Sequence, residues 1–255
     1  MNRLCSFWKS RKVQELRIGE TPVMMQDKNL SINRGMIHVW SARYSTLDRY
    51  YPLLSGLISP AEMLNAAGFK KPSDTRRYIL RHGLVREILG QYTNKDPANI
   101  SFVYGRSGKP DINPEGTFPD LRFSFSRTEE MVCIGITLKS EIGLDIVKIQ
   151  PRYSFSAISN YLFTPDERRW IGHVVPDQRP FRFFRIWSLK EALLKATGGD
   201  VQTMKETDVS PVMTDAFLDG FYTMNLGETD QKCFIHESGC GVGHHGALAA
   251  ITKTT

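Results

Sequence analysis

The segment that most constrains the fold is an apolar strand that carries a single acid. Residues 142–147 read Ile-Gly-Leu-Asp-Ile-Val, so aliphatic side chains alternate with Gly143, Asp145 and Val147. An acid in so apolar a strand is costly to bury unless a cation or hydrogen bonds meet it. The strand alone leaves open a second interpretation, in which Asp145 caps a turn at the strand end.

A later segment has the period of a helix. Four apolar residues recur at spacings of three and four and predict one buried stripe: Ile186, Leu189, Leu193 and Ala196. Glu191 and Lys195 lie one turn apart on the neighbouring stripe, beside Trp187 and Leu194. Partly apolar surroundings would raise the pKa of Glu191, and Lys195 would oppose that rise. Glu191 is then a candidate base or metal ligand, although the helix alone favours an ordinary surface ion pair of Glu191 and Lys195.

Together the two segments resemble the signature of the surfactin-synthetase-type 4'-phosphopantetheinyl transferases. The resemblance is carried by Gly143-Leu144-Asp145 and by Trp187-Ser188-x-Lys190-Glu191-x-x-x-Lys195. Three upstream blocks agree with it: the Gly-Lys-Pro turn at 108–110, the Phe-Ser-Phe-Ser-Arg-Thr stretch at 123–128 and the basic helix at 76–86. The blocks follow the family's order from about residue 38 to residue 251.

The resemblance implies an α+β fold of two similar α/β-type halves related by a pseudo-twofold axis, with the active site in the cleft between them. The expected division is a loosely packed extension at 1–33, a first half at 34–138 with coenzyme A and carrier contacts, and a second half at 139–255 with the magnesium and catalytic residues. Residues 139–141 are the expected link between the halves.

Periodicity and turn residues predict the individual elements. The expected strands are 37–44, 100–104, 121–125, 131–138, 143–149, 221–226, 232–237 and 246–252. The expected helices are 61–67, 75–89, 154–161, 165–171 and 180–196, the last one ended by two consecutive glycines.

The resemblance also implies a reaction and a set of roles. The enzyme, of the holo-[acyl-carrier-protein] synthase type, moves the phosphopantetheine arm of coenzyme A to a serine of an apo acyl or peptidyl carrier protein and releases 3',5'-ADP. Asp145 and Glu191 would hold Mg²⁺, Glu191 would take the serine proton, and Lys195 would offset charge on the leaving phosphate. The expected coenzyme A contacts are Lys109 and Ser126 at the diphosphate or 3'-phosphate, and Arg77 at the 3'-phosphate.

Two positions depart from the family pattern. Val147 stands where a second carboxylate usually follows the Asp, and water can fill that place because Mg²⁺ keeps several waters. Arg127 stands where the family usually has His, and it keeps a positive charge near a phosphate. Lys70, Lys71 and Arg76 are either further phosphate contacts or a solvated helix surface.

Composition is compatible with this interpretation. The 255-residue chain carries a net charge of +6, which suits an anionic cofactor and an acidic protein partner and would also suit nucleic acid. Four scattered cysteines favour a reducing cytosol, no apolar run reaches the length of a membrane span, and the first twelve residues lack the apolar core of a secretory signal. The chain is therefore expected to be a cytoplasmic monomer without membrane or nucleic-acid contacts.

Three alternatives remain at this point. A catalytically weak relative that only binds coenzyme A would explain the departures at Val147 and Arg127. A nucleic-acid-binding module would explain the charge, but it requires base-stacking aromatics among the basic residues. A zinc site is the third, because four possible ligands have suitable spacing: Cys233, His236, Cys240 and His244.

Overall fold

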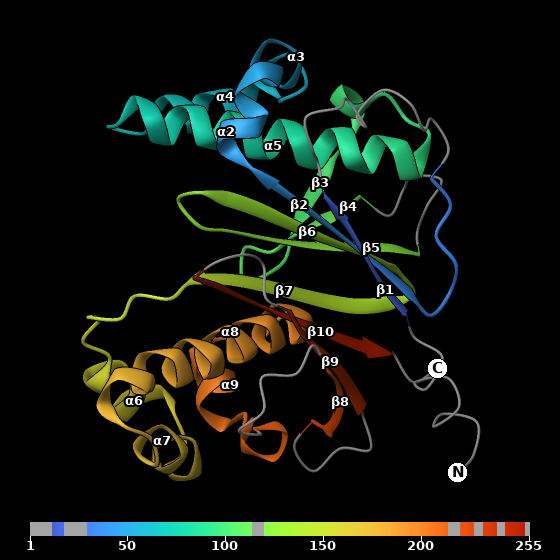
Figure 1. The fold of residues 1–255 in the computed structure, drawn as a ribbon. Helices are drawn as coiled ribbons and strands as arrows, with labels where there is room; N and C mark the ends of the chain where they lie inside the picture. Colours follow the sequence, from blue (N-terminus) through green and yellow to red (C-terminus); the bar gives the residue numbers. More distant parts are fainter. Residues whose placement is uncertain are drawn as a thin grey trace.

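The computed structural model describes residues 12–17, 30–113, 120–213, 220–226, 232–238 and 243–252. The chain forms an α+β structure of four stacked layers, in which helix α5 (Pro72–Thr93) lies on one sheet and helix α8 (Arg179–Thr197) lies on another (Figure 1). The expected fold class is confirmed at this level.

Within the described residues, the first sheet has four strands in the order β1 (Lys12–Arg17), β2 (Met36–Arg43), β6 (Met131–Leu138) and β5 (Leu121–Arg127). β1 runs parallel to β2, and the other neighbours are antiparallel. The expectation that residues 1–33 pack loosely is wrong for β1, since Val13 and Leu16 contact the core. These two apolar residues lie three apart, so the segment shows no alternation from which a strand could be predicted.

The second sheet is antiparallel in the order β7 (Ser140–Lys148), β10 (His244–Thr252), β9 (Lys232–Ser238) and β8 (Gly220–Asn225). Of residues 139–141, expected to link the two halves, only the first lies between the strands. Lys139 turns the chain with a φ of 58°, whereas Ser140 and Glu141 already belong to β7. β6 therefore passes almost directly into the strand that carries Asp145.

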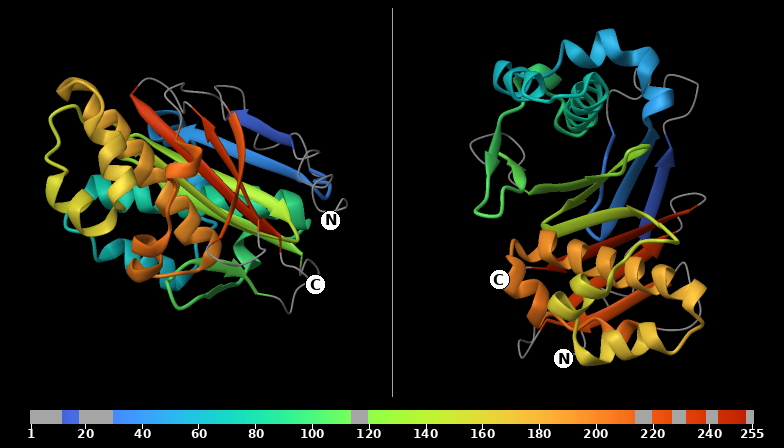
Figure 2. Two further views of the ribbon diagram at one scale, coloured as in Figure 1. Left: turned by 90° about the horizontal axis from the view of Figure 1, so that it is seen from below. Right: turned by 90° about the vertical axis from the view of Figure 1, so that its left-hand side faces the viewer.

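Shorter elements surround the layers. The helices α2 (Tyr44–Leu47), α3 (Tyr51–Ser55) and α4 (Pro60–Ala67) precede α5, while α6 (Ser156–Leu162), α7 (Pro165–Gly172) and α9 (Val201–Glu206) lie on the α8 side (Figure 2). A small hairpin of β3 (Phe102–Tyr104) and β4 (Pro110–Ile112) leads from α5 to β5.

The predicted elements agree with the structure within a few residues at their ends. Four short elements, α2, α3, α9 and β4, are not predicted from the sequence, and each has six residues or fewer. No helix within the described ranges combines the length and the apolar character that a membrane crossing needs.

Apolar side chains fill the three interfaces between the layers. The interface between the sheets includes Ile37, Ile142, Leu144 and Leu248, so the aliphatic face of β7 points at the first sheet. The predicted helical stripe of α8 lies in the interface with the second sheet, and each of its four members is at most 3% exposed. Burial of these two faces fixes the direction in which the acid of β7 and the charged stripe of α8 point.

Gly143 allows α8 to lie unusually close to β7. A Cβ atom at this position would lie 1.8 Å from the carbonyl oxygen of Ala192, a separation that no side chain could accept. The glycine of the sequence motif therefore has a packing role: it lets the helix that carries Glu191 and Lys195 approach the strand that carries Asp145.

Candidate functional site

Asp145 is buried where the two halves meet. Its Oδ1 accepts a hydrogen bond from the Ser126 hydroxyl at 2.7 Å and from the Lys195 Nζ at 2.6 Å. Lys195 also donates to the carbonyl oxygen of Leu144 at 3.1 Å. Asp145 is 6% exposed, and these contacts from β5 and α8 supply the hydrogen bonds and the cation that a buried carboxylate requires. The interpretation of Asp145 as a turn cap is wrong, because it lies inside β7.

Glu191 lies beside this cluster on α8. Burial raises the pKa of Glu191, the negative charge of Asp145 raises it further, and the positive charge of Lys195 opposes the rise. The effects predicted for burial and for Lys195 are both present. Since the carboxyl group is close enough to Asp145 to feel its charge, the two acids form an electrostatically coupled pair that favours a shared cation or a proton.

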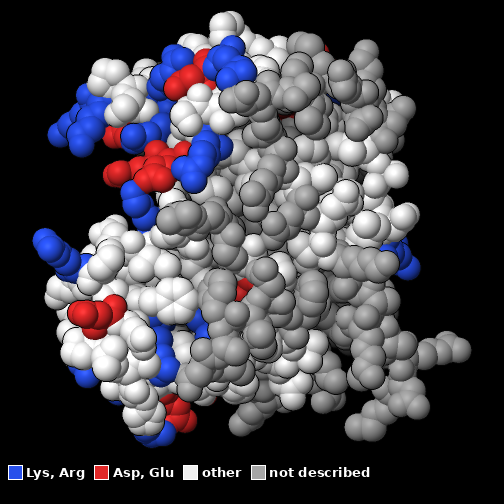
Figure 3. Space-filling view, in the orientation of Figure 1, with Lys and Arg blue, Asp and Glu red and all other residues white. Residues whose placement is uncertain are grey.

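A cleft opens over Asp145. It encloses about 920 Å³, near the upper end of the ~300–1,000 Å³ that is usual for small-molecule sites. Residues of both halves line it, including Arg77, Ser126 and Arg127 on one side and Asp145 and Trp187 on the other. In the space-filling view the surface is hollowed between the two halves, with basic and acidic side chains on the edge formed near α4 and α5 (Figure 3).

Lys109, Glu191 and Lys195 line a second, smaller pocket of about 260 Å³. Lys109 Nζ donates to the carbonyl oxygen of Ile142 at 2.7 Å, and burial lowers its pKa, opposed mainly by Glu141. The contact between Lys195 and Asp145 joins this pocket to the cleft. All the residues selected from the sequence thus surround two adjoining cavities, with the ion pair of Lys195 and Asp145 between them.

The other basic residues of the first half differ in position. Arg77 lines the cleft but is paired with Asp74 at 3.1 Å. Arg76 pairs with Asp48 at 2.6 Å and points into a different depression, and Lys70 and Lys71 are exposed. The solvated-surface interpretation therefore suits these last three residues.

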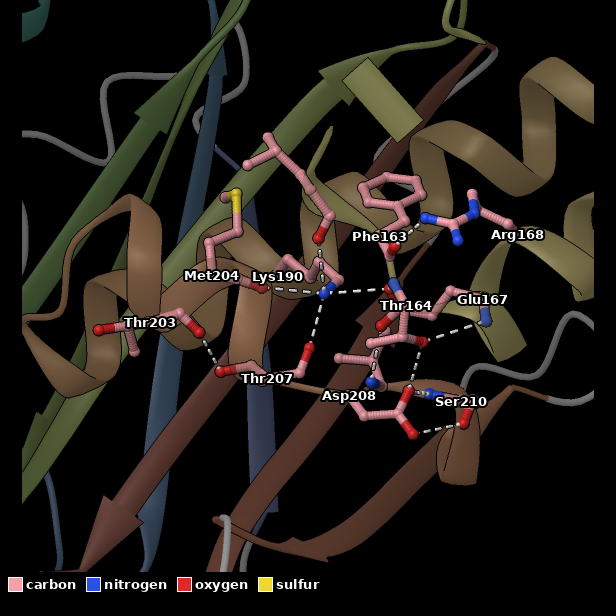
Figure 4. A network of polar contacts seen from close by, with 12 residues as sticks. Phe163, Thr164, Glu167, Arg168, Lys190, Thr203, Met204, Thr207, Asp208 and Ser210 are labelled. Atoms are coloured by element: carbon pink, nitrogen blue, oxygen red, sulfur yellow. Dashed lines mark hydrogen bonds and ion pairs between the residues drawn. The ribbon is translucent and has the colours of Figure 1, made fainter. Parts of the chain in front are cut away.

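Lys190, the lysine next to Glu191, has no role that the sequence pattern predicts. Its Nζ lies 3.0 Å from an oxygen of Glu167 and donates to the carbonyl oxygens of Leu162, Met204 and Thr207 (Figure 4). Both charged side chains are fully buried. Lys190 thus joins α8 to α7 and α9 on the side away from the cleft, and the motif lysine has a structural role.

A second buried network fixes the middle of α8. The Ser188 hydroxyl lies 2.7 Å from His245 Nδ1, and His245 Nε2 lies 3.0 Å from Glu237, which also pairs with Arg185 at 2.6 Å. This order resembles that of a nucleophilic triad, but Ser188 and His245 have no exposed surface. The network joins α8 to β9 and β10 and holds the turn of the helix that precedes Glu191.

Val147 is half-buried and packs against the core beneath α8 while also lining the cleft. A carboxylate side chain at position 147 would therefore point into the cleft. Among the described residues there is no group of three or more His, Cys, Asp or Glu side chains that could hold a metal ion. Two carboxylates suit Mg²⁺ nevertheless, since this ion binds oxygen, retains several waters and is commonly held by one or two acids together with substrate phosphates.

The zinc interpretation is wrong for the described residues. Cys233 packs into the core beneath α8. His236 lies on the opposite face of β9, the face that it shares with Phe234 and that points toward the space between the sheets. Three residues apart on a strand, they point to opposite faces of the sheet and cannot share one ion. Cys240 lies outside the described residues.

The coupling between Glu191 and Asp145 makes a prediction for the metal-free protein. Glu191→Gln should increase the free energy of unfolding, and the gain should grow with pH. Below the ordinary glutamate pKa of 4.5 the carboxyl group is protonated in both states, so the substitution changes little. As the pH rises through the raised pKa of the folded state, folding requires a buried charge, and the wild type loses stability that the glutamine variant keeps.

Denaturant titrations of both proteins with chelator, across the acid-to-neutral range, measure this effect. Glu206→Gln is the matched control, because Glu206 is exposed and contacts only Gln202 within the described part of the chain. A difference between wild type and Glu191→Gln that stays constant with pH would contradict the coupling.

A model of the 4'-phosphopantetheinyl transferase superfamily matches residues 141–249, which include all of β7 but its first residue, α8 and the site acids. The 4'-phosphopantetheinyl transferase HetI of Nostoc sp. is 26% identical over 187 residues, covering 73% of this chain and 79% of that protein. The 4'-phosphopantetheinyl transferase AcpT of Salmonella typhimurium is 30% identical over 151 residues, covering 59% and 74%. A 4'-phosphopantetheinyl transferase of Bacillus subtilis is 29% identical over 167 residues, covering 66% and 70%.

Proposed function

The chain belongs to the 4'-phosphopantetheinyl transferase superfamily, and from this premise we infer that it transfers 4'-phosphopantetheine from coenzyme A to a serine of an apo acyl or peptidyl carrier protein. The products are the holo-carrier and 3',5'-ADP, as in enzymes of the holo-[acyl-carrier-protein] synthase type. The observation that carries this proposal is the meeting of the two signature segments at the cleft: Asp145 from β7 contacts Lys195 at 2.6 Å and shifts the pKa of Glu191.

Each site residue has a role that follows from its surroundings. The serine oxygen forms a bond to the phosphorus that bears pantetheine, the bond from that phosphorus to the bridging oxygen breaks, and the electron pair leaves with 3',5'-ADP. Glu191 accepts the serine proton, which its raised pKa favours. Lys195 supplies positive charge at the leaving phosphate, and Lys109 does so from the smaller pocket.

Asp145 and Glu191 together would hold Mg²⁺, which supplies charge neutralisation for the diphosphate when it is bound. Ser126 orients Asp145 through the 2.7 Å hydrogen bond. Because Asp145 is already fixed by Ser126 and Lys195, its carboxylate needs little reorganisation to accept a cation. Arg127 lies on the first-half edge of the cleft, where it can contact a phosphate.

The two halves that line the cleft have different proposed roles. Residues 34–138 supply the basic wall for coenzyme A, and residues 139–255 supply the two acids, with a pseudo-twofold relation between the halves. We expect a cytoplasmic monomer that requires neither a membrane nor nucleic acid. Phe183 is buried in the core of the second half, where it cannot stack with bases.

One observation favours a second candidate, a coenzyme A-binding relative with weak catalysis. Val147 presents an aliphatic side chain to the cleft where a carboxylate would add a metal ligand. Water in that place preserves the metal site, so we favour the active enzyme.

The test is incubation of the purified protein with coenzyme A, Mg²⁺ and several apo carrier proteins, followed by intact-mass measurement of each carrier. The proposed function predicts a mass increase of one phosphopantetheine group on at least one carrier, which is lost when the metal is chelated. Binding of coenzyme A without modification of any carrier would favour the weak relative. Absence of both binding and modification would refute the proposal.

A further inference from the structure

Arg81 differs from two other buried arginines of this protein. Arg86 pairs with Glu62 at 2.8 Å and Arg185 pairs with Glu237 at 2.6 Å, so each of these two guanidinium groups has a buried carboxylate. Arg81 is 5% exposed, yet among the described residues no carboxylate forms an ion pair with it, and its Nε has no hydrogen-bond partner there. A buried charge without a counter-charge is expensive for a protein to retain.

The surroundings of Arg81 fix its position without neutralising it. Its guanidinium carbon lies 5.1 Å from the centre of the Tyr78 ring and 5.9 Å from that of Phe125. One of its terminal nitrogens lies 3.4 Å from His82 Nε2. Burial lowers the pKa of Arg81 and the positive charge of Arg127 lowers it further, while Tyr44 and Tyr78 oppose the shift. Arg81 and Arg127 both line the cleft.

Glu62, a buried acid of α4, has other partners than Arg81. Glu62 accepts hydrogen bonds from the Ser59 backbone at 2.7 Å and from Arg86 at 2.8 Å, and it contacts His82 Nδ1 at 3.2 Å. Burial opposes the ionised form, but these partners lower the pKa of Glu62 to about 2. Glu62 is therefore ionised and committed to Arg86 and His82, which leaves the positive charge of Arg81 for a ligand.

The cleft that Arg81 lines also contains Arg77, one turn earlier on α5, and Arg127. Arg77 is paired with Asp74 and its side chain is 34% exposed, so its charge is already partly compensated. A phosphate monoester carries up to two negative charges, and guanidinium binds it through two parallel hydrogen bonds. Such an anion would neutralise the repulsion between Arg81 and Arg127.

We propose that Arg81 is the principal phosphate-monoester anchor of the cleft and sets the preference for a 3'-phosphorylated cosubstrate. This assignment rests on the proposed function, in which the diphosphate lies at Asp145, Glu191 and Lys195, so that the first-half wall receives the 3'-phosphate. Arg81 then takes the role of 3'-phosphate contact that the sequence predicts for Arg77.

Titration calorimetry with coenzyme A and with dephospho-coenzyme A, which lacks the 3'-phosphate, tests the proposal. Arg81→Met should weaken coenzyme A binding by about tenfold or more, because charge-assisted hydrogen bonds are lost, and should leave dephospho-coenzyme A binding within about twofold. Arg81→Lys keeps the charge without the paired hydrogen bonds and should give an intermediate preference. Arg77→Gln should reduce the preference less than Arg81→Met does.

Stability separates this role from a structural one. Since Arg81 is buried without a counter-charge, Arg81→Met should leave the melting temperature of the ligand-free protein unchanged or raise it. Arg86→Met leaves Glu62 buried without its arginine partner and should lower the melting temperature. Arg169→Gln removes an exposed arginine that pairs only with Asp166 in the described part of the chain, and it is the control for a general loss of positive charge.

Three outcomes would overturn the proposal: an undiminished preference for coenzyme A in Arg81→Met, an equal loss for both ligands, or a lowered melting temperature. If the wild type modifies carriers while any of these occurs, the assignment fails and the proposed function stands. If the wild type neither binds coenzyme A nor modifies carriers, both fail.

Discussion

Replacement of Asp145 by alanine is expected to lower kcat for carrier modification by about a thousandfold or more, a loss of the size caused by removing a principal electrostatic group from an active site. Asp145 is the acid that contacts both Ser126 and Lys195, so its loss removes a metal ligand and the partner of the site lysine. The fold should survive, since Lys195 keeps its 3.1 Å bond to the Leu144 carbonyl.

Steady-state kinetics with a fixed apo carrier and saturating coenzyme A measure the effect. Asp145→Asn preserves the shape and one hydrogen-bond acceptor but not the charge, and it should be nearly as inactive as the alanine variant. Asp166→Asn alters an exposed acid on α7 and should have near-normal activity. Near-normal turnover of Asp145→Ala would remove Asp145 from the site.

The largest effect on stability is expected at Lys190. Lys190→Met should lower the free energy of unfolding by about 3–5 kcal/mol, the usual result of removing one partner of a buried ion pair. Glu167 would remain buried, with the backbone nitrogens of Thr164 and Val209 as its donors, and three carbonyl oxygens would lose their donor. Chemical denaturation with wild-type and variant protein measures the change.

Lys139→Met is the matched control, because Lys139 and Asp120 form an ion pair of which both members are about half exposed. That variant should change stability by less than about 1 kcal/mol. A double variant with Glu167→Gln should recover part of the loss at Lys190, because the stranded charge is then removed. A small effect of Lys190→Met, similar to that of the control, would contradict the structural role.

The site acids could be predicted because local patterns place them. Alternation in β7 and the helical period of α8 assign Asp145 and Glu191 to defined faces, and the apolar residues of those elements are buried as expected. Gly143 permits the close approach that joins these faces. The sequence contains the pattern of each element, and the order of the motif blocks indicates that the elements meet.

Other features depend on partners distant in the sequence, and no local pattern reveals them. Lys190 looks like any helical lysine until Glu167 and the carbonyl groups of α9 and its flanking residues surround it. β1 becomes a strand through pairing with β2. Arg81 and Arg77 lie in the same basic helix. Asp74, three residues before Arg77, is a local partner, but only the tertiary position of Glu62, which pairs with Arg86, shows that this buried acid does not compensate Arg81.

The proposed function depends most directly on a metal ion bound between Asp145 and Glu191. Mn²⁺ accepts the same oxygen ligands as Mg²⁺ and can be located by its anomalous scattering. In crystals grown with Mn²⁺ and coenzyme A, the account predicts one anomalous peak about 2 Å from carboxylate oxygens of Asp145 and Glu191, in contact with the diphosphate. A metal bound to the diphosphate but away from both carboxylates would contradict it.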